Sequence, residues 1–437
     1  MRSAELRTLD RELRAYLESF TDGMGRPERR RAMGWYITGL LLDGERKSTL
    51  PMAARLVDDE SEVAAMRQRL HECVSISDWS DDEVRTRLAR KIDGELPGIE
   101  AFVIDDTGFP KKGKLSVGVQ RQYSGTLGRR DNCQVATSLH LAGEMGSGCI
   151  ALRLYLPESW AADSKARKLT GVPDEIRFLR KWEISLKQID DAVGWGVRKH
   201  PVLGDAGYGD CSEFREALTS RGLPYVLGVN SAHLIWPPGS QPRRPSRRPG
   251  QGGKAPTKYV DDNLKPLAIA DFVKDLPRTS YKRITWREGS RGRQTSRFLA
   301  FRIRAASDHH YGAQPSDEQW LLCNWLEGEK APKFFLSTLP PSTPLKQLAH
   351  MARLRWRVER DYQELKQEIG LDHYEGRGWR GFHHHATLCA VAHAFLALRR
   401  ALFPPKQNQV DATDGPAPAA VRAASHHRHM STVQAAS

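Results

Sequence analysis

Two short apolar runs, far apart in the chain, each end in an aspartate. Residues 102–104 (FVI) lead directly into Asp105 and Asp106. Residues 202–204 (VLG) lead into Asp205. Apolar runs of this length are typical of strands buried in a sheet. A carboxylate at the end of a buried strand is costly unless a cation or a hydrogen-bond donor lies against it. The chain must therefore fold so that positive groups meet these strand ends.

The segments around both runs alternate between strand and helix, which predicts a mixed α/β core whose later strands are parallel. In such a sheet, residues just past the carboxyl ends of the strands line the functional crevice, so we expect Asp105 and Asp205 at one rim. The expected elements are strands at 101–105, 115–120, 132–142 and 149–156, a helix within 173–197, the strand PVLGD, the helix SEFREALTSRG and the strand PYVLGVN.

The remaining segments define the domain organisation. Leucines at helical spacing and Ser80 as an N-cap predict a helical domain over 1–97. The basic cluster within it, which includes the arginines at 29–31, makes this domain a candidate for DNA binding. A long helix is expected at 344–370 and another at 383–402. The predicted domains are the N-terminal domain, a core over 98–230 and 336–402, a β-rich insertion over 231–335 with a basic disordered loop at 237–258, and a disordered tail over 403–437.

The charge balance points to a polyanionic partner. The chain has 67 Lys+Arg against 53 Asp+Glu, a formal net charge of +14. Nucleic acid is the first partner that such a surplus favours, although a basic surface also serves solubility. The six cysteines include no C-x-x-C pair, which indicates reduced thiols rather than a zinc ribbon. With a charged amphipathic N-terminus and no apolar run long enough for a membrane span, we expect a cytoplasmic protein with no membrane partner.

A third acid, Glu359, lies in the predicted helix 344–370. Arg355, Glu359, Tyr362 and Lys366 fall within roughly a 60° arc of one helix face. An adjoining apolar stripe would dock this helix on the sheet, so that Glu359 lies at the edge of the buried face with cations one turn on either side. Three carboxylates without His or Cys partners suit hard metals such as Mg²⁺, and a pair of such ions supports phosphodiester cleavage. Taken singly, however, a strand-end Asp is commonly a cap and an Arg/Glu/Lys face a surface ion-pair array.

Together the three motifs resemble bacterial insertion-sequence transposases of the D-D-E type, which are DDE superfamily endonucleases with a ribonuclease-H-like catalytic core. In one branch of that family the motifs read apolar-Asp-x-(Ser/Thr), Asp-Ala-Gly-(Phe/Tyr) and Tyr-x2-Arg-x3-Glu-x6-Lys. The sequence matches them with VIDDT, GDAGY and Arg355-x3-Glu359-x6-Lys366. It departs from them at Ala352, where the branch has a Tyr that helps to hold DNA; Tyr362 is a candidate to replace it.

The resemblance implies a ribonuclease-H-like mixed sheet flanked by helices and a cut-and-paste DNA transposase. Asp105, Asp205 and Glu359 would bind two Mg²⁺ ions, for which Mn²⁺ can substitute. Water would free a 3′-OH at each transposon end, and that hydroxyl would attack target DNA. The partners would be the inverted-repeat ends and target DNA, bound by a homodimer.

DNA contacts are expected from several segments. Trp286 is the candidate to stack on a flipped base, as a Trp does in relatives, with Trp320 and Trp325 as alternatives. The arginines at 29–31 could equally be a solvated helix start. The expected DNA-binding residues are Arg355, Lys366, Tyr362, Lys111, Lys112, Lys114, Trp286, Arg287, Arg291, Arg29, Arg30 and Arg31.

Several alternatives stay open at this stage. A transposase-derived DNA-binding regulator and a ribonuclease-H-like nuclease without strand transfer share the same motifs. A glycosidase also uses paired carboxylates, but it would have no need of the basic surplus. Asp106 is a second candidate for the metal, although alternation along a strand puts Asp105 on the face of Thr107. His383, His384 and His385 are expected to contact the DNA backbone or to form a plain helix start.

Overall fold

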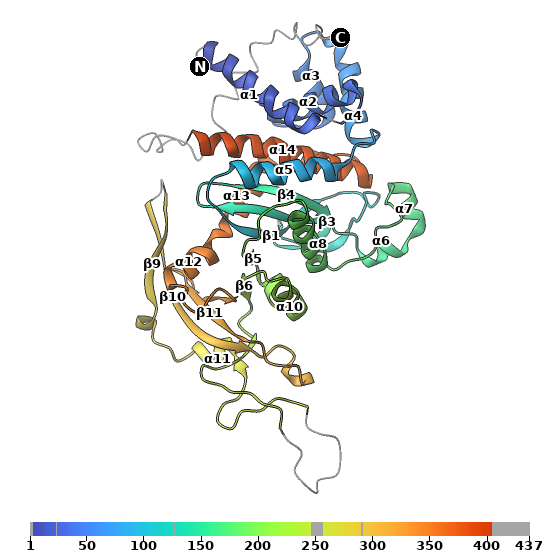
Figure 1. Ribbon diagram of the computed structural model, residues 1–437. Helices are drawn as coiled ribbons and strands as arrows, with labels where there is room; N and C mark the ends of the chain where they lie inside the picture. Colours follow the sequence, from blue (N-terminus) through green and yellow to red (C-terminus); the bar gives the residue numbers. More distant parts are fainter. Residues whose placement is uncertain (1–2, 23, 126, 246–256, 290–291, 404–437) are drawn as a thin grey trace. The chain divides into compact units, whose positions relative to one another are not determined.

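The computed structural model describes residues 3–22, 24–125, 127–245, 257–289 and 292–403 (Figure 1). They form two compact units. Unit 1 consists of the described residues within 1–100, 104–198 and 357–437, and unit 2 consists of those within 101–103 and 199–356. Strand β1 (Ile99–Pro110) contributes to both units, since the division passes through it.

The N-terminal part of unit 1 is helical. Helix α5 begins directly after Ser80, whose hydroxyl accepts a hydrogen bond from the Glu83 amide at 3.2 Å, so the predicted N-cap is confirmed. Pro27 stands in the first turn of α2, where its missing N–H costs nothing. The helices are α1 (Ser3–Thr21), α2 (Pro27–Leu41), α3 (Thr49–Leu56), α4 (Val63–Ser75) and α5 (Asp81–Glu95).

Strand β3 is central to the sheet of unit 1, because it lies between β2 and β1 and also pairs with β4. The strand predicted at 115–120 is wrong. Gly118 has φ +70°, which interrupts an extended backbone, and β2 begins only at Gln120. The further elements are β2 (Gln120–Ser124), β3 (Arg129–Gly143), β4 (Ser147–Leu154), α6 (Glu158–Ala162), α7 (Ser164–Thr170) and α8 (Lys181–Gly194).

Helix α14 (Trp379–Leu402) is the central helix of unit 1. It contacts β4 and α5 as well as α2 and α4, so it lies between the sheet and the N-terminal helices (Figure 1). Nearly every residue from Trp379 to Leu396 is buried, as expected for a helix covered on all sides. The predicted helix at 383–402 is confirmed and begins one turn earlier.

Unit 2 contains the predicted parallel strands, although its other strand pairs are antiparallel. Residues 101–103 of β1 pair in parallel with β5 (Val202–Gly204), and β5 pairs in parallel with β6 (Tyr225–Val229). Strand β12 (Lys333–Ser337) then pairs antiparallel with β6 and with β11 (Glu318–Trp325). The strands of the predicted insertion therefore extend the same sheet.

The sheet of unit 2 continues from β11 into β10, which pairs with both β9 and β7. Short helices connect these strands. The remaining elements are α9 (Ala206–Gly209), α10 (Ser212–Ser220), β7 (Leu234–Trp236), β8 (Leu267–Ala268), α11 (Ile269–Val273), β9 (Lys282–Gly289), β10 (Gly292–Ala305) and α12 (Leu345–Leu354).

The single helix predicted at 344–370 is wrong. Helix α12 ends at Leu354, and α13 (Trp356–Gln367) begins after Arg355. Glu359, Tyr362 and Lys366 therefore share α13, whereas Arg355 is the C-cap of α12.

The fold class is confirmed as mixed α/β, with a mixed sheet flanked by helices that is consistent with a ribonuclease-H-like fold. The domain boundaries at 97, 230 and 335 stay predictions. The tail beyond 403 and most of the basic loop, residues 246–256, lie outside the described residues. Within the described ranges, no helix is long and apolar enough to cross a membrane.

Three consecutive histidines on α14 are buried, so the expected DNA contact is wrong for them. His383 accepts from the Leu154 amide at 3.3 Å, and the His384 ring stacks on Trp79 at 3.7 Å. His385 donates from Nε2 to the Gly370 carbonyl at 3.1 Å and faces the Tyr36 hydroxyl through Nδ1 at 2.8 Å. The three rings point to different elements around the helix because adjacent residues stand about 100° apart.

These histidines predict that acid destabilises the fold. Burial lowers the pKa of His383, His384 and His385 to about 4, whereas unfolded histidines titrate near 6.5. Between about pH 4 and pH 6.5 these histidines are largely protonated in the unfolded chain but neutral in the folded chain. Their contribution is therefore complete above about pH 6.5 and falls by up to about 1.4 kcal/mol per pH unit for each histidine toward pH 4. Urea denaturation of wild type and His385→Gln across this range measures it; equal slopes for both proteins would contradict the assignment.

Candidate active site

Asp105 lies in β1 and is half-buried. Its carboxylate accepts a hydrogen bond from the Asp106 amide at 2.8 Å. The Asp106 carboxylate instead forms an ion pair with Lys181 at 2.6 Å. Asp105 thus accepts a hydrogen bond from a backbone amide, whereas Asp106 pairs with a lysine. Lys181 supplies the positive charge that the Asp106 carboxylate requires.

Asp205 follows β5 in unit 2 and is half-buried. Its side chain accepts from the Gly207 amide at 2.9 Å and so caps the short helix α9. Gly209 holds that helix directly against β6, because a Cβ at this position would lie 1.8 Å from the Gly228 carbonyl oxygen. Close packing of α9 on β6 therefore requires a glycine at position 209.

Glu359 lies in the first turn of α13 and is exposed. The next turns of the helix are joined to unit 1. The Tyr362 hydroxyl lies 2.5 Å from that of Ser138 on β3, and Lys366 Nζ donates to the Gly108 carbonyl on β1 at 2.9 Å. Burial, together with the Asp105 carboxylate, raises the pKa of Tyr362 well above its ordinary value. The helix that carries Glu359 is therefore attached to the strand that carries Asp105.

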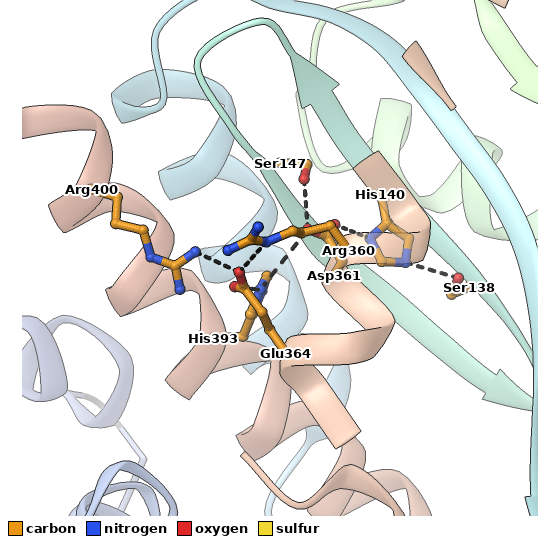
Figure 2. Close-up of polar contacts among 8 residues, drawn as sticks. All are labelled: Ser138, His140, Ser147, Arg360, Asp361, Glu364, His393 and Arg400. Atoms are coloured by element: carbon orange, nitrogen blue, oxygen red, sulfur yellow. Dashed lines mark hydrogen bonds and ion pairs between the residues drawn. The ribbon is translucent and has the colours of Figure 1, made fainter. Parts of the chain in front are cut away.

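A buried polar cluster fixes α13, and Figure 2 shows its members. The Asp361 carboxylate accepts from His140 Nδ1 at 2.7 Å and from the Ser147 hydroxyl at 2.6 Å. His140 Nε2 lies 2.9 Å from the Ser138 hydroxyl. Burial disfavours a charge on the imidazole, but the Cys149 sulfur and the Asp361 carboxylate outweigh it and raise the pKa of His140 to about 10.

Glu364, one turn further along α13, is the second acid of the cluster. Its carboxylate accepts from His393 at 3.1 Å, from Arg400 at 2.8 Å and from Arg360 at 2.8 Å (Figure 2). Burial by itself would raise the pKa of Glu364. The donors outweigh burial and hold the pKa of Glu364 far below its ordinary range. His393 and Arg400 belong to α14, so this acid fastens α13 to the central helix.

The cluster was not predicted from the sequence. One local signal was available: Asp361 stands three residues after Val358 and four before Leu365, both buried, so it falls within the apolar stripe of the helix. An acid in such a stripe requires a buried partner. The partner His140 could not be identified, because it lies far away in the sequence.

The basic residues predicted to bind DNA differ in their surroundings. Arg29 and Arg30 on α2 are half-buried, and exposed Arg31 pairs with Glu28 at 3.3 Å. Lys111 is half-buried and donates to the Tyr374 carbonyl at 3.0 Å, and burial lowers its pKa. Two further lysines that follow β1 are exposed, namely Lys112 and Lys114.

In unit 2, Trp286 is half-buried and donates from Nε1 to the Ser296 hydroxyl at 3.0 Å. The Arg353 guanidinium lies 4.2 Å from the centre of its ring. The alternatives are covered in a similar way, Trp320 by Arg302 at 4.9 Å and Trp325 by Arg278 at 4.8 Å.

The remaining predicted contacts give less information. Ala352, at the position of the missing tyrosine, is buried in α12. Arg355 is half-buried and lies in unit 2. The side chain of Arg287 and all of Arg291 lie outside the described residues.

The donor chemistry of the three acids fits a hard divalent cation, since they offer only carboxylate oxygens. His140 of the buried cluster uses both ring nitrogens in contacts with Asp361 and Ser138. In the described part of the chain, no group of three or more His, Cys, Asp or Glu side chains is arranged to hold a metal ion.

Comparison with known proteins bears on the same segments. The family model for the DDE superfamily endonucleases matches residues 19–293. That match includes Asp105 and Asp205 and ends before Glu359. A relative from Microchaete diplosiphon, named as a probable transposase for insertion sequence element IS701, is 31% identical over 199 residues, which are 45% of this chain and 48% of the relative. The chain thus spans about half the length of the curated relative that it matches.

The close approach at Gly209 gives a test of the segment that carries Asp205. We expect Gly209→Ala to destabilise the protein by about 2–4 kcal/mol, because the added methyl group must displace α9 from β6. Gly194→Ala at the exposed end of α8, where a Cβ meets nothing within 4 Å, is the matched control and should be neutral or slightly stabilising. Thermal and urea unfolding measure both, and equal stability of the two variants would contradict the packing role of Gly209.

Proposed function

Because the chain belongs to the DDE superfamily endonucleases, we propose that it is a DNA transposase that cuts transposon ends and joins them to target DNA. The similarity to an insertion-sequence transposase supports this proposal. The observation that carries it is the parallel register of β1, which contains Asp105, with β5, which Asp205 follows. Val103 pairs with Leu203, and two residues further along come Asp105, within β1, and Asp205, just after β5. Parallel pairing in this register favours neighbouring positions for the two acids.

We propose that Asp105, Asp205 and Glu359 hold two Mg²⁺ ions, with Mn²⁺ as a substitute. The ions would activate water, or a DNA 3′-OH, and stabilise the leaving oxygen during phosphodiester cleavage and transfer. The protein supplies the positions of the acids: the β1 backbone for Asp105, the cap of α9 for Asp205 and the anchored helix α13 for Glu359. Lys366 and Tyr362 act first as anchors of α13 through their bonds to Gly108 and Ser138.

Several basic and aromatic groups are proposed to hold DNA. Lys112 and Lys114 are exposed a few residues beyond Asp105 on the same chain segment, which suits phosphate contacts near the cut. Trp286 would exchange its contact with the Arg353 guanidinium for stacking on a base. A homodimer would bring two transposon ends together.

The acids give the direct test of this function. DNA that carries the element's own ends is incubated with Mg²⁺ and wild type, Asp105→Asn, Asp205→Asn or Glu359→Gln. Each variant should lose cutting by about a thousandfold or more while its DNA affinity changes little. Asp106→Asn is the matched control: it breaks the partly exposed ion pair with Lys181 and should cut within about threefold of wild type. Normal cutting by any of the three variants would remove that acid from the site.

Products of the same reaction separate the proposed transposase from its alternatives. Joined products with target DNA support transposition. Cutting without joining would indicate a nuclease, and end binding without cutting would indicate a DNA-binding regulator.

A further inference from the structure

One hydroxyl group in unit 1 connects the strand of Asp105 with the helix of Glu359. Ser138 Oγ on β3 lies 2.5 Å from the Tyr362 hydroxyl on α13 and 2.9 Å from His140 Nε2. It also donates to the main-chain carbonyl of Asp105 on β1, at a longer 3.5 Å. Three elements of unit 1 therefore meet at this side chain.

The Ser138 hydroxyl has three polar neighbours. A serine hydroxyl has one donor and two acceptor positions. Its Oγ lies against His140 Nε2 and the Tyr362 hydroxyl, and its proton can reach the Asp105 carbonyl. Three neighbours match the three positions of one hydroxyl, so Ser138 can join β1, β3 and α13 at a single point.

Tyr362 stands three residues after Glu359, so the two side chains leave α13 on neighbouring faces about one turn apart. A rotation of α13 about its axis that moved Glu359 would also pull Tyr362 away from Ser138. The Asp361 and Glu364 pairs oppose the same rotation from the buried side of the helix. Ser138 is the member that also reaches the backbone of Asp105.

We propose that Ser138 and Tyr362 are positioning residues that set the placement of Glu359 relative to Asp105. Neither side chain touches the metal or the DNA in this role; each acts through the backbone or the helix that it holds. The inference rests on the proposed function, because it presumes that both acids serve one metal-dependent site.

Three variants test it: Ser138→Ala, Tyr362→Phe and the double variant. The Mn²⁺ affinity of the protein bound to end DNA is measured by electron paramagnetic resonance, and cutting is followed as a function of Mg²⁺ concentration. Each single variant should weaken Mn²⁺ binding and raise the Mg²⁺ requirement by about tenfold, as loss of an outer support of a metal ligand does. DNA affinity should stay within about twofold.

Both substitutions remove the same Ser138–Tyr362 hydrogen bond. The Mn²⁺ affinity of the double variant should therefore be no lower than that of the single variant with the lower affinity. Tyr16→Phe is the matched control. It deletes one buried hydroxyl that donates to the Val391 carbonyl at 2.7 Å on α14, also in unit 1, but not on α13. It should lower thermal stability while leaving the Mn²⁺ affinity and the Mg²⁺ requirement unchanged.

Unchanged Mn²⁺ affinity in both single variants would overturn the inference. So would effects that multiply to about a hundredfold in the double variant, or a Tyr16→Phe protein with the same loss of affinity. If wild type binds Mn²⁺ but does not cut, the proposed function fails while the affinities of the variants still decide the positioning role. If wild type binds no Mn²⁺ at all, both proposals are wrong.

Discussion

Two carboxylates buried on one helix determine how unit 1 must be assembled. Asp361 and Glu364 lie one turn apart on α13, and each would cost several kcal/mol, of order 3–5, if it were left without partners. The partners come from β3, β4 and α14: His140, Ser147, His393 and Arg400. The helix can be buried only in the rotation and position at which all of these donors are reached. Packing of the apolar stripe alone would allow more freedom, because apolar contacts have no direction.

That constraint has a consequence for chemistry. The buried side of α13 is fixed by charged hydrogen bonds, so the orientation of its exposed side, where Glu359 stands, is fixed as well. Lys366 and Ser138 each donate a hydrogen bond to a main-chain carbonyl of β1. These two bonds fix the orientation of α13 relative to the strand that contains Asp105. A metal-dependent site requires its ligands to be held within a fraction of an ångström, and supports of this kind provide such precision. The family match covers Asp105 and Asp205 but not α13, so the structural attachments of this helix are the main support for the role of Glu359.

Much of this organisation could be predicted from the sequence because it is local. The apolar runs predicted β1 and β5, and strand–helix alternation predicted the parallel pairing that joins β1, β5 and β6. The predicted end of the first strand at Asp105 is wrong, because β1 continues to Pro110. The errors have physical reasons as well. Alternation at 115–120 resembled a strand, but Gly118 adopts a positive φ. The three histidines were expected to contact the DNA backbone or to form a plain helix start, but they are buried, and hydrogen bonds and stacking compensate for their burial. The pairing of Asp361 with His140 links residues from distant segments, which no local pattern can reveal.

The most direct test of a shared site for the three acids is metal-directed cleavage of the protein chain itself. Fe²⁺ is substituted for Mg²⁺ in the complex with end DNA, and ascorbate with peroxide generates radicals that cut the backbone beside the bound ion. If Asp105, Asp205 and Glu359 hold the same ions, cuts will appear next to all three residues. Excess Mg²⁺ will suppress these cuts together, and Glu359→Gln will weaken all of them. Cuts confined to other segments, or the absence of cutting at any one of the three, would contradict the proposed assembly.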